Sequence, residues 1–334
     1  RPAQKRKNLR TEVNAQVTRV LFEGTRAVGV EYMQYGKLVT LRANREVLLT
    51  AGALQSPQLL MLSGVGPGDH LREHGIAVRH HLPGVGQNLQ DHLQLRLMYK
   101  IKKPITTNDD LKSNWRKFMM GWNWATRRAG PLAIGINHGG MFTRVLPESK
   151  TPDIQFHFAA LSAEMAGAPT HPWSGCTFSV CQLRPESRGQ IRLKSTDALQ
   201  PPAMYSNYLS HETDRRCVVE SVRFARKLAH TRAMSDLIDD EYRPGDSAQS
   251  DDEVLQFARN YGATIFHPSG TCKMAAEGDD MGVVDTRLRV RGVTGLRVID
   301  CSIMPTLVSG NTNSPVVMIA EKAADMIKTD NRNN

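Results

Sequence analysis

The sequence lacks several patterns that would assign it to common classes of protein. No apolar run approaches the roughly 18 residues of a membrane-spanning helix, so we expect no integral membrane segment. The cysteines form no CxxC pair and no zinc-like spacing, which predicts reduced and mostly buried thiols. Reduced thiols favour a cytoplasmic protein, with association at a membrane surface left open. The five cysteines are Cys176, Cys181, Cys217, Cys272 and Cys301.

The basic residues that give the chain a formal net charge of +10 are mostly scattered. The one dense cluster is 1–7, and no aromatic residues interleave it as a base-stacking surface would require. We therefore expect a solvated face there and no nucleic-acid partner. A chain of 334 residues with 40% hydrophobic residues can build a core and suggests two domains.

The first fifty residues have the pattern of β-strands. Residues 15–24 alternate in polarity, and residues 26–43 predict a hairpin that turns at Tyr35-Gly36. The stretch EVLLTAGA (46–53) is a fully apolar strand, which is typical of a parallel sheet covered on both faces.

A helix is predicted directly after this apolar strand, over residues 56–64. Ser56 suits the N-cap, Pro57 suits the first helical position, and Gly64 ends the helix. A buried strand, a glycine turn and a capped helix form a unit that binds phosphates at the helix N-terminus. The glycine-rich loops that follow do not contain the GxGxxG pattern.

The middle and the end of the chain differ in character. Between 93 and 265 we expect helices at 109–128, 211–230 and 250–262, and antiparallel strands at 153–161, 176–183 and 188–195. The tail returns to a buried strand in the stretch 295–305, which ends at Asp300, and a long helix at 313–330. Strands and helices without strict alternation suggest an α+β region inserted into an α/β region.

The stretch FHPSGTCKM (266–274) places a histidine beside glycine, threonine and cysteine. Taken alone, His267 has three interpretations: a catalytic base, a metal ligand with Cys272, or a core histidine. An imidazole has an ordinary pKa near 6.5 and can therefore act as a base at neutral pH. A zinc site would need further ligands, which this stretch does not supply.

Seven blocks in order resemble one family, the glucose–methanol–choline (GMC) oxidoreductases, and in particular its choline dehydrogenase-like, FAD-dependent alcohol dehydrogenases. Along the chain, the blocks are VTRVLFEGTRAVGVEY (17–32), GALQSPQLLMLSGVG (52–66), PGVGQNLQDH (83–92), SRGQIRLKS (187–195), FHPSGTCKM (266–274), GLRVIDCSIMP (295–305) and SGNTNSPVVMIAEKAADMI (309–327). They extend over nearly the whole chain. Family members begin with a strand–GxGxxG–helix unit, so the sequence resembles the later portion of such a protein.

This resemblance implies a fold class of α/β plus α+β, in which an incomplete FAD-binding Rossmann-like domain carries an inserted antiparallel-sheet substrate domain. Residues 1–92 would be part of the FAD-binding domain. Residues 93–263 would bind substrate. Residues 264–334 would complete the FAD-binding domain with the catalytic residues.

The resemblance also implies roles for individual residues. His267 would be the proton acceptor, and Asn311, forty-four positions later, would orient the alcohol oxygen; a turn at 309–311 is the structural alternative. The FAD contacts implied by the family blocks are Val17, Asn88, Asp300, Cys301, Asn313 and Pro315. Strand packing, turn formation and loop capping are the structural alternatives for Val17, Asn88 and Asp300. No metal is implied.

The implied activity is oxidation of a primary alcohol to an aldehyde by hydride transfer to FAD. The stretch GINHGGMF (135–142) lacks the acid of choline-type members, so an uncharged alcohol is favoured over choline. The electron acceptor, oxygen or a quinone-like carrier, is left open. Two alternatives are a truncated, non-catalytic fragment that cannot hold FAD alone and a member with non-redox chemistry such as cyanohydrin cleavage.

Overall fold

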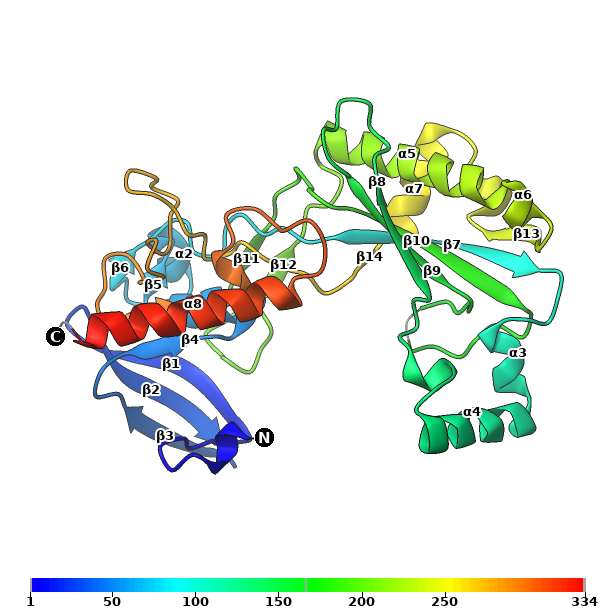
Figure 1. Ribbon diagram of the computed structural model, residues 1–334. Helices are drawn as coiled ribbons and strands as arrows, with labels where there is room; N and C mark the ends of the chain where they lie inside the picture. Colours follow the sequence, from blue (N-terminus) through cyan, green and yellow to red (C-terminus); the bar gives the residue numbers. More distant parts are fainter. Residues whose placement is uncertain (1, 166, 333–334) are drawn as a thin grey trace. The chain divides into compact units, whose positions relative to one another are not determined.

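The computed structural model describes residues 2–165 and 167–332, so Arg1 of the basic cluster lies outside the described residues. The chain forms two compact units built from separated segments (Figure 1). Unit 1 comprises Arg1–Asp91, Arg188–Asn207 and His267–Asn334, and unit 2 comprises His92–Ser187 and Tyr208–Phe266. The expected middle region, 93–263, therefore differs from unit 2 mainly at 188–207, which lies in unit 1.

Unit 1 contains a three-stranded antiparallel meander of β1 (Ala15–Glu23), β2 (Arg26–Gln34) and β3 (Lys37–Arg42). Tyr35 and Gly36 join β2 to β3 with positive φ angles of 50° and 75°. Two positive φ angles are the geometry of the tight turn that matches the strand twist. The hairpin predicted at this dipeptide is thus confirmed.

Two short strands of unit 1 pair in parallel: β4 (Val47–Leu49) and β15 (Leu296–Val298). This pair confirms the parallel arrangement expected from the apolar stretch at 46–53. Helix α1 (Gly52–Leu62) follows β4 and contacts β1 and η4 (Cys301–Ile303), and the long helix α8 (Asn313–Arg332) lies near β4 in Figure 1. The core of unit 1 includes Leu60, Val298 and Ala323, which are almost completely buried.

Helix α1 begins at Gly52, four residues earlier than predicted, and it contains Pro57 within its length. Ser56 was therefore the wrong N-cap, because its side chain lies inside the helix and donates to Asp300 at 2.6 Å. Pro57 has no N–H to donate to the carbonyl of Ala53, four residues before it. The hydroxyl of Thr271 donates to that carbonyl instead, at 2.6 Å, so the helix tolerates the proline.

The remaining elements of unit 1 are short. Strands β5 (Val65–Gly66) and β6 (His80–His81) pair in parallel, and β11 (Gln190–Arg192) and β12 (Ala203–Tyr205) pair antiparallel. The other short elements are α2 (Gly68–Glu73), η1 (Ala3–Lys5) and η4 (Cys301–Ile303). The backbone of β11 bonds to the loop before β7: Ile191 N donates to Gly86 O at 2.7 Å. This bond explains why 188–207 belongs to unit 1.

Unit 2 is built on a six-stranded antiparallel sheet, in which β14 also pairs with β7. The sheet order is β13 (Ile238–Arg243), β7 (Leu93–Ile101), β10 (Gly175–Gln182), β9 (Ile154–Ala159) and β8 (Gly139–Thr143), with β14 (Ala263–Thr264) beside β7. Helices α5 (Glu212–Ala229) and α7 (Asp251–Tyr261) pack on this sheet (Figure 1). They bury apolar side chains such as Val222 and Phe257 against Phe178 of β10. Helix α6 (Arg232–Ser235) and η3 (Gly245–Ser247) complete this part.

The long connection between β7 and β8 contains α3 (Thr107–Lys112), α4 (Asn114–Arg127) and η2 (Pro131–Ala133). The single helix expected at 109–128 is therefore two helices. The chain is extended at Ser113, whose hydroxyl accepts from Arg116 N at 3.3 Å and so caps α4.

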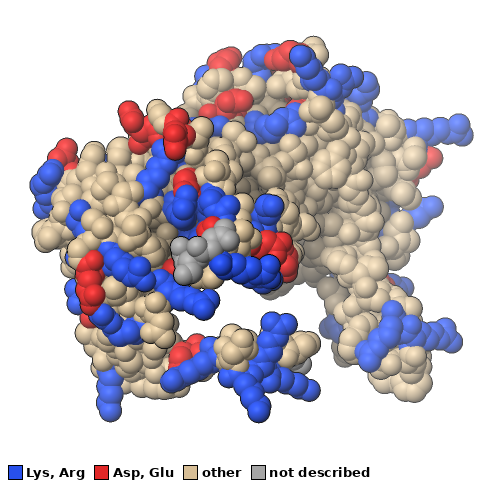
Figure 2. Space-filling view, turned by 60° about the vertical axis from the view of Figure 1, so that its left-hand side comes forward, with Lys and Arg blue, Asp and Glu red and all other residues tan. Residues whose placement is uncertain are grey.

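Lys and Arg side chains are distributed over much of the surface in Figure 2, with Asp and Glu between them. Among the described residues, no helix is both long enough and apolar enough to cross a membrane.

Candidate functional site

Asp300 follows the carboxyl end of β15, which is the edge of a parallel sheet where ligands usually bind. One carboxylate oxygen accepts from Gly52 N at 2.9 Å and from the Ser56 hydroxyl at 2.6 Å. The other accepts from Ser302 N at 2.8 Å. Asp300 thus caps both α1 and η4, as the structural alternative from the sequence had it, and its contact with FAD remains a prediction.

The segment 270–271 joins this strand end to α1. Gly270 has φ +91°, and a Cβ there would lie 2.6 Å from the backbone oxygen of Asn88. Its N–H donates to the carbonyl of Cys301 at 3.2 Å. Glycine is therefore required at 270 by both its backbone angle and the space around it.

Asn88 holds three segments of unit 1 together. It has a left-handed backbone with φ 62°. Its amide donates to the carbonyls of Gly270 (3.1 Å) and Pro305 (3.2 Å), and its side-chain oxygen accepts from Arg188 Nε (3.1 Å). These contacts bring Asn88 and Cys301 together around Gly270. They support the turn interpretation of Asn88, and a contact with FAD stays a prediction.

His267 lies three residues before Gly270 along the chain, and 8% of its surface is exposed. Its backbone N–H donates to the carboxylate of Asp91 at 3.0 Å. Burial lowers the pKa of the imidazole below 6.5, and the negative charge of Asp91 opposes this shift. His267 is therefore neutral at pH 7 and able to accept a proton.

Asn311, Asn313 and Pro315 lie around the start of α8. Asn311 and Asn313 are exposed, and Pro315 is half-buried. No acidic residue lies in the first turn of α8, so its positive end keeps its charge.

Val17 is half-buried in β1, where it pairs with Tyr32 and packs against the core of unit 1. This is the strand-core alternative noted from the sequence. Burial raises the pKa of the Cys301 thiol, and the charge of Asp300 adds to that shift. Neither observation tests a flavin contact for these residues.

Sequence reasoning missed Gln90, which anchors the loop between η4 and α8. Its amide donates to Pro305 O at 3.2 Å, and its side-chain oxygen accepts from Leu307 N at 3.0 Å. Thr271 was also missed as the partner of Ala53. A proline within the helix was the available signal, because it leaves a carbonyl without its usual donor.

Metal binding by His267 with Cys272 finds no support in the described residues, where no three His, Cys, Asp or Glu side chains are placed to hold an ion. Burial raises the pKa of the Cys272 thiol well above its ordinary value, whereas a metal ligand would have to be a thiolate.

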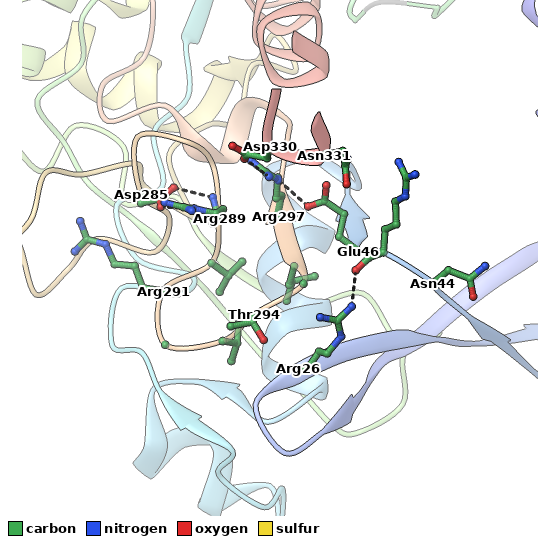
Figure 3. A pocket seen from close by; sticks show the side chains of 16 residues that line it. Arg26, Asn44, Glu46, Asp285, Arg289, Arg291, Thr294, Arg297, Asp330 and Asn331 are labelled. Carbon is green, nitrogen blue, oxygen red and sulfur yellow. Dashed lines mark hydrogen bonds and ion pairs between the residues drawn. The ribbon is translucent and has the colours of Figure 1, made fainter. Parts of the chain in front are cut away.

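A cavity of about 980 Å³ lies at the opposite, amino ends of β4 and β15 (Figure 3). One of its lining residues is the buried Arg297, which donates to Glu46 and to Asp330, both at 2.7 Å. Arg291 donates to backbone carbonyls, and Arg289 pairs with Asp285. Because these groups satisfy one another, we assign the cavity a structural role.

The comparisons with known proteins agree with this architecture. The N-terminal GMC oxidoreductase model matches residues 1–94, and the C-terminal GMC oxidoreductase model matches residues 185–320. Mitochondrial choline dehydrogenase of Mus musculus is 45% identical over 327 residues, which are 98% of this chain and 55% of that protein. Oxygen-dependent choline dehydrogenase of Staphylococcus aureus is 41% identical over 328 residues, which are 98% of this chain and 57% of that protein.

A solved structure of a formate oxidase from Aspergillus oryzae RIB40, in a study of FAD modification, superposes with a TM-score of 0.89. It is 27% identical, and the match covers 96% of this chain and 60% of that one. The predicted fold class, an α/β region with an inserted antiparallel sheet, is confirmed. The chain spans about half the length of the curated relatives that it matches. By these matches the chain belongs to the GMC oxidoreductase family.

Proposed function

We propose that this chain carries the later part of an FAD-dependent enzyme that oxidises a primary alcohol to an aldehyde. Unit 1 would hold the cofactor, and unit 2 would bind the alcohol. The observation that carries the proposal is the buried His267, whose lowered pKa keeps it neutral at pH 7 and so available to accept a proton.

The start of α8 fits the electron-rich end of a flavin. It is the N-terminus of a 20-residue helix with no acidic residue in its first turn. The exposed Asn313 stands at its first position. Such a helix end supplies partial positive charge and backbone N–H donors. We propose that Asn313 and Pro315 contact the cofactor there.

The other proposed contacts are Val17, Asn88, Asp300 and Cys301. Asp300 and Cys301 lie at the carboxyl edge of the parallel strands, which favours a ligand nearby. Asn88 is held against Gly270 in the next segment. In this proposal they shape the cofactor site mainly through the backbone, because the side chains of Asn88 and Asp300 already hold protein groups.

When bound, FAD would accept a hydride from the carbon that bears the hydroxyl group. A ring nitrogen of His267 takes the hydroxyl proton, so that the C=O bond can form as the hydride leaves. The amide of Asn311 donates a hydrogen bond to the substrate oxygen and keeps it in line. Asp91 fixes the backbone of His267 and thereby the position of the imidazole.

The substrate could be choline or an uncharged alcohol, and a direct comparison of the two can decide. The named relatives are choline dehydrogenases, which favours choline. No acidic residue lies in 129–143, where Asn137 and His138 precede the two glycines of β8, which favours an uncharged alcohol. We propose the uncharged class. Its test compares kcat/KM for choline with kcat/KM for the isostere in which carbon replaces the ammonium nitrogen, and a preference for choline contradicts it.

The function is tested by the visible spectrum of the purified chain with added FAD, before and after a primary alcohol is added without air. Bands of bound flavin that bleach with alcohol support the proposal. A colourless protein would favour the alternative of a fragment that cannot hold FAD alone. Bound flavin that alcohol does not reduce would favour non-redox chemistry such as cyanohydrin cleavage. Admitting air and then a quinone would identify the acceptor.

The role of His267 is tested by His267→Ala in flavin-loaded protein. Loss of a general base typically lowers the rate by roughly 10²- to 10⁴-fold, so we expect kcat/KM to fall by that factor with flavin still bound. Asn311→Ala should lower kcat/KM less steeply, since only orientation is lost. Unchanged kcat/KM in His267→Ala would remove this residue from the mechanism.

A further inference from the structure

Helix α4 of unit 2 carries a row of aromatic side chains on its outer face. Trp115, Phe118 and Trp122 are 69%, 57% and 56% exposed. Their spacing of three and four residues places them on one face of the helix. The rings follow one another with centroid distances of 5.7 Å and 6.3 Å and nearly parallel planes. An exposed apolar row of this kind marks an interaction surface.

Unit 2 contacts α4 from another side. The half-buried residues of the helix are Met119, Met120, Gly121 and Asn123, and no residue of α4 is buried. The helix contacts mainly α3 and η2, and it lies apart from the sheet of its own unit (Figure 1). The aromatic row therefore does not belong to the core of unit 2.

Every charged side chain between Ser113 and Gly130 is basic. The four residues are Arg116, Lys117, Arg127 and Arg128. Arg116 reaches back to Asp110 of α3 at 3.2 Å, and the guanidinium of Arg128 lies 4.3 Å from the ring centre of Trp124. Apolar exposure continues beyond η2, at Leu132, Ile134 and Ile136.

We propose that α4 and the segment that follows it, up to Ile136, bind the surface of an anionic lipid bilayer. Aromatic rings favour the depth of the lipid headgroups, and Lys and Arg side chains reach the anionic groups around them. With 14 residues, three of them charged, α4 would lie in the plane of the surface and not cross it. A second copy of α4 is a poorer partner, because the two helices would bring basic residues together with no acid between them.

The test uses sedimentation of the full chain with vesicles of phosphatidylcholine, alone or mixed with phosphatidylserine. We expect salt-sensitive binding to the mixed vesicles and weaker binding to phosphatidylcholine alone. Three of the four tryptophans lie on α4, so tryptophan emission should shift to shorter wavelength on binding. The absence of both signals would overturn the proposal.

The matched variants replace three exposed aromatic residues each. Replacing Trp115, Phe118 and Trp122 with serine should weaken vesicle binding by about tenfold or more, because apolar contact with the bilayer is lost. The control replaces Tyr35, Phe142 and Tyr205, which are exposed outside α4, with serine. This control variant should bind vesicles as the parent chain does. Circular dichroism checks that both variants are folded.

Three results would contradict the assignment. Equal vesicle binding by the α4 variant and the control variant would show that the aromatic row is not used. Equal binding to neutral and anionic vesicles would remove the role of the basic residues. A chain that is dimeric in solution, and monomeric only in the α4 variant, would assign the face to a second copy.

Discussion

The capping role assigned to the carboxylate of Asp300 can be tested by a single substitution, Asp300→Asn. The side chain connects the start of α1 with the start of η4 through acceptors for Gly52 N, the Ser56 hydroxyl and Ser302 N. Asparagine keeps only one acceptor oxygen, and its NH₂ group would face either Gly52 N–H or Ser302 N–H. One of these backbone donors then loses its partner.

The expected cost follows from these contacts. A hydrogen bond to a charged group contributes about 1.5 to 3 kcal/mol, and a buried donor without a partner costs about 1 to 3 kcal/mol. We therefore expect Asp300→Asn to lower the free energy of unfolding of unit 1 by about 2 to 4 kcal/mol. For a unit of this size, that corresponds to a fall in Tm of roughly 5 to 15 °C.

The assay is urea unfolding and thermal unfolding of the chain without cofactor, so that a lost flavin contact cannot contribute. Asp280→Asn is the matched control in the same unit, because Asp280 is exposed and should tolerate the change within about 0.5 kcal/mol. If Asp300→Asn unfolds at the same urea concentration as Asp280→Asn, the capping role assigned to Asp300 is wrong. Loss of FAD affinity without loss of stability would then favour a direct cofactor contact.

Three further outcomes follow from unit 1. Thr271→Val should cost about 1 to 3 kcal/mol in urea unfolding because the carbonyl of Ala53 loses its donor, whereas Thr271→Ser should retain most of the stability. Gly292→Ala should lower the free energy of unfolding by more than about 2 kcal/mol, since residue 292 has φ +74° and a Cβ there would lie 2.0 Å from the His80 ring. Gly278→Ala has a similar φ of +88° but open space around it, so it should lower the free energy of unfolding by only about 1 kcal/mol. Equal losses in the two variants would contradict the clash at residue 292. Burial lowers the pKa of three histidines in unit 1 below 6.5, so their unfolded forms bind protons more strongly. These residues are His70, His80 and His267, and their contribution to stability should be complete above pH 6.5 and be lost as pH falls through their lowered pKa values in the folded state. A Tm that stays constant over that pH range would contradict this expectation.

Local signals in the sequence were sufficient where neighbouring residues decide the structure. The Tyr35-Gly36 hairpin was predicted because its turn needs only two residues with positive φ. Helix α7 was predicted near its observed bounds, and Ser250 with Glu253 forms a capping box at its start. The five cysteines are free thiols, as their spacing indicated.

The errors concern contacts between distant parts of the chain. Helix α1 begins at Gly52 because Asp300, 248 positions away, accepts from its first N–H, and the local pattern at Ser56 could not reveal this. Residues 188–207 join unit 1 through backbone bonds to the loop at 86–89. Of the candidate site, the sequence singled out His267 and Asn88, whose proposed roles stay predictions. It did not indicate Gln90 or Thr271, whose importance depends on partners far along the chain.

The central claim is that His267 is the base of an alcohol oxidation that uses FAD. The most direct measurement is the rate of flavin bleaching by a primary alcohol without air, followed as pH is lowered, in the parent chain and in His267→Ala. The account predicts a rate that falls with acid only below pH 6.5, because burial lowers the pKa of His267, and a slow rate without this acid limb in the variant. Flavin that bleaches equally fast in both proteins at every pH would contradict it.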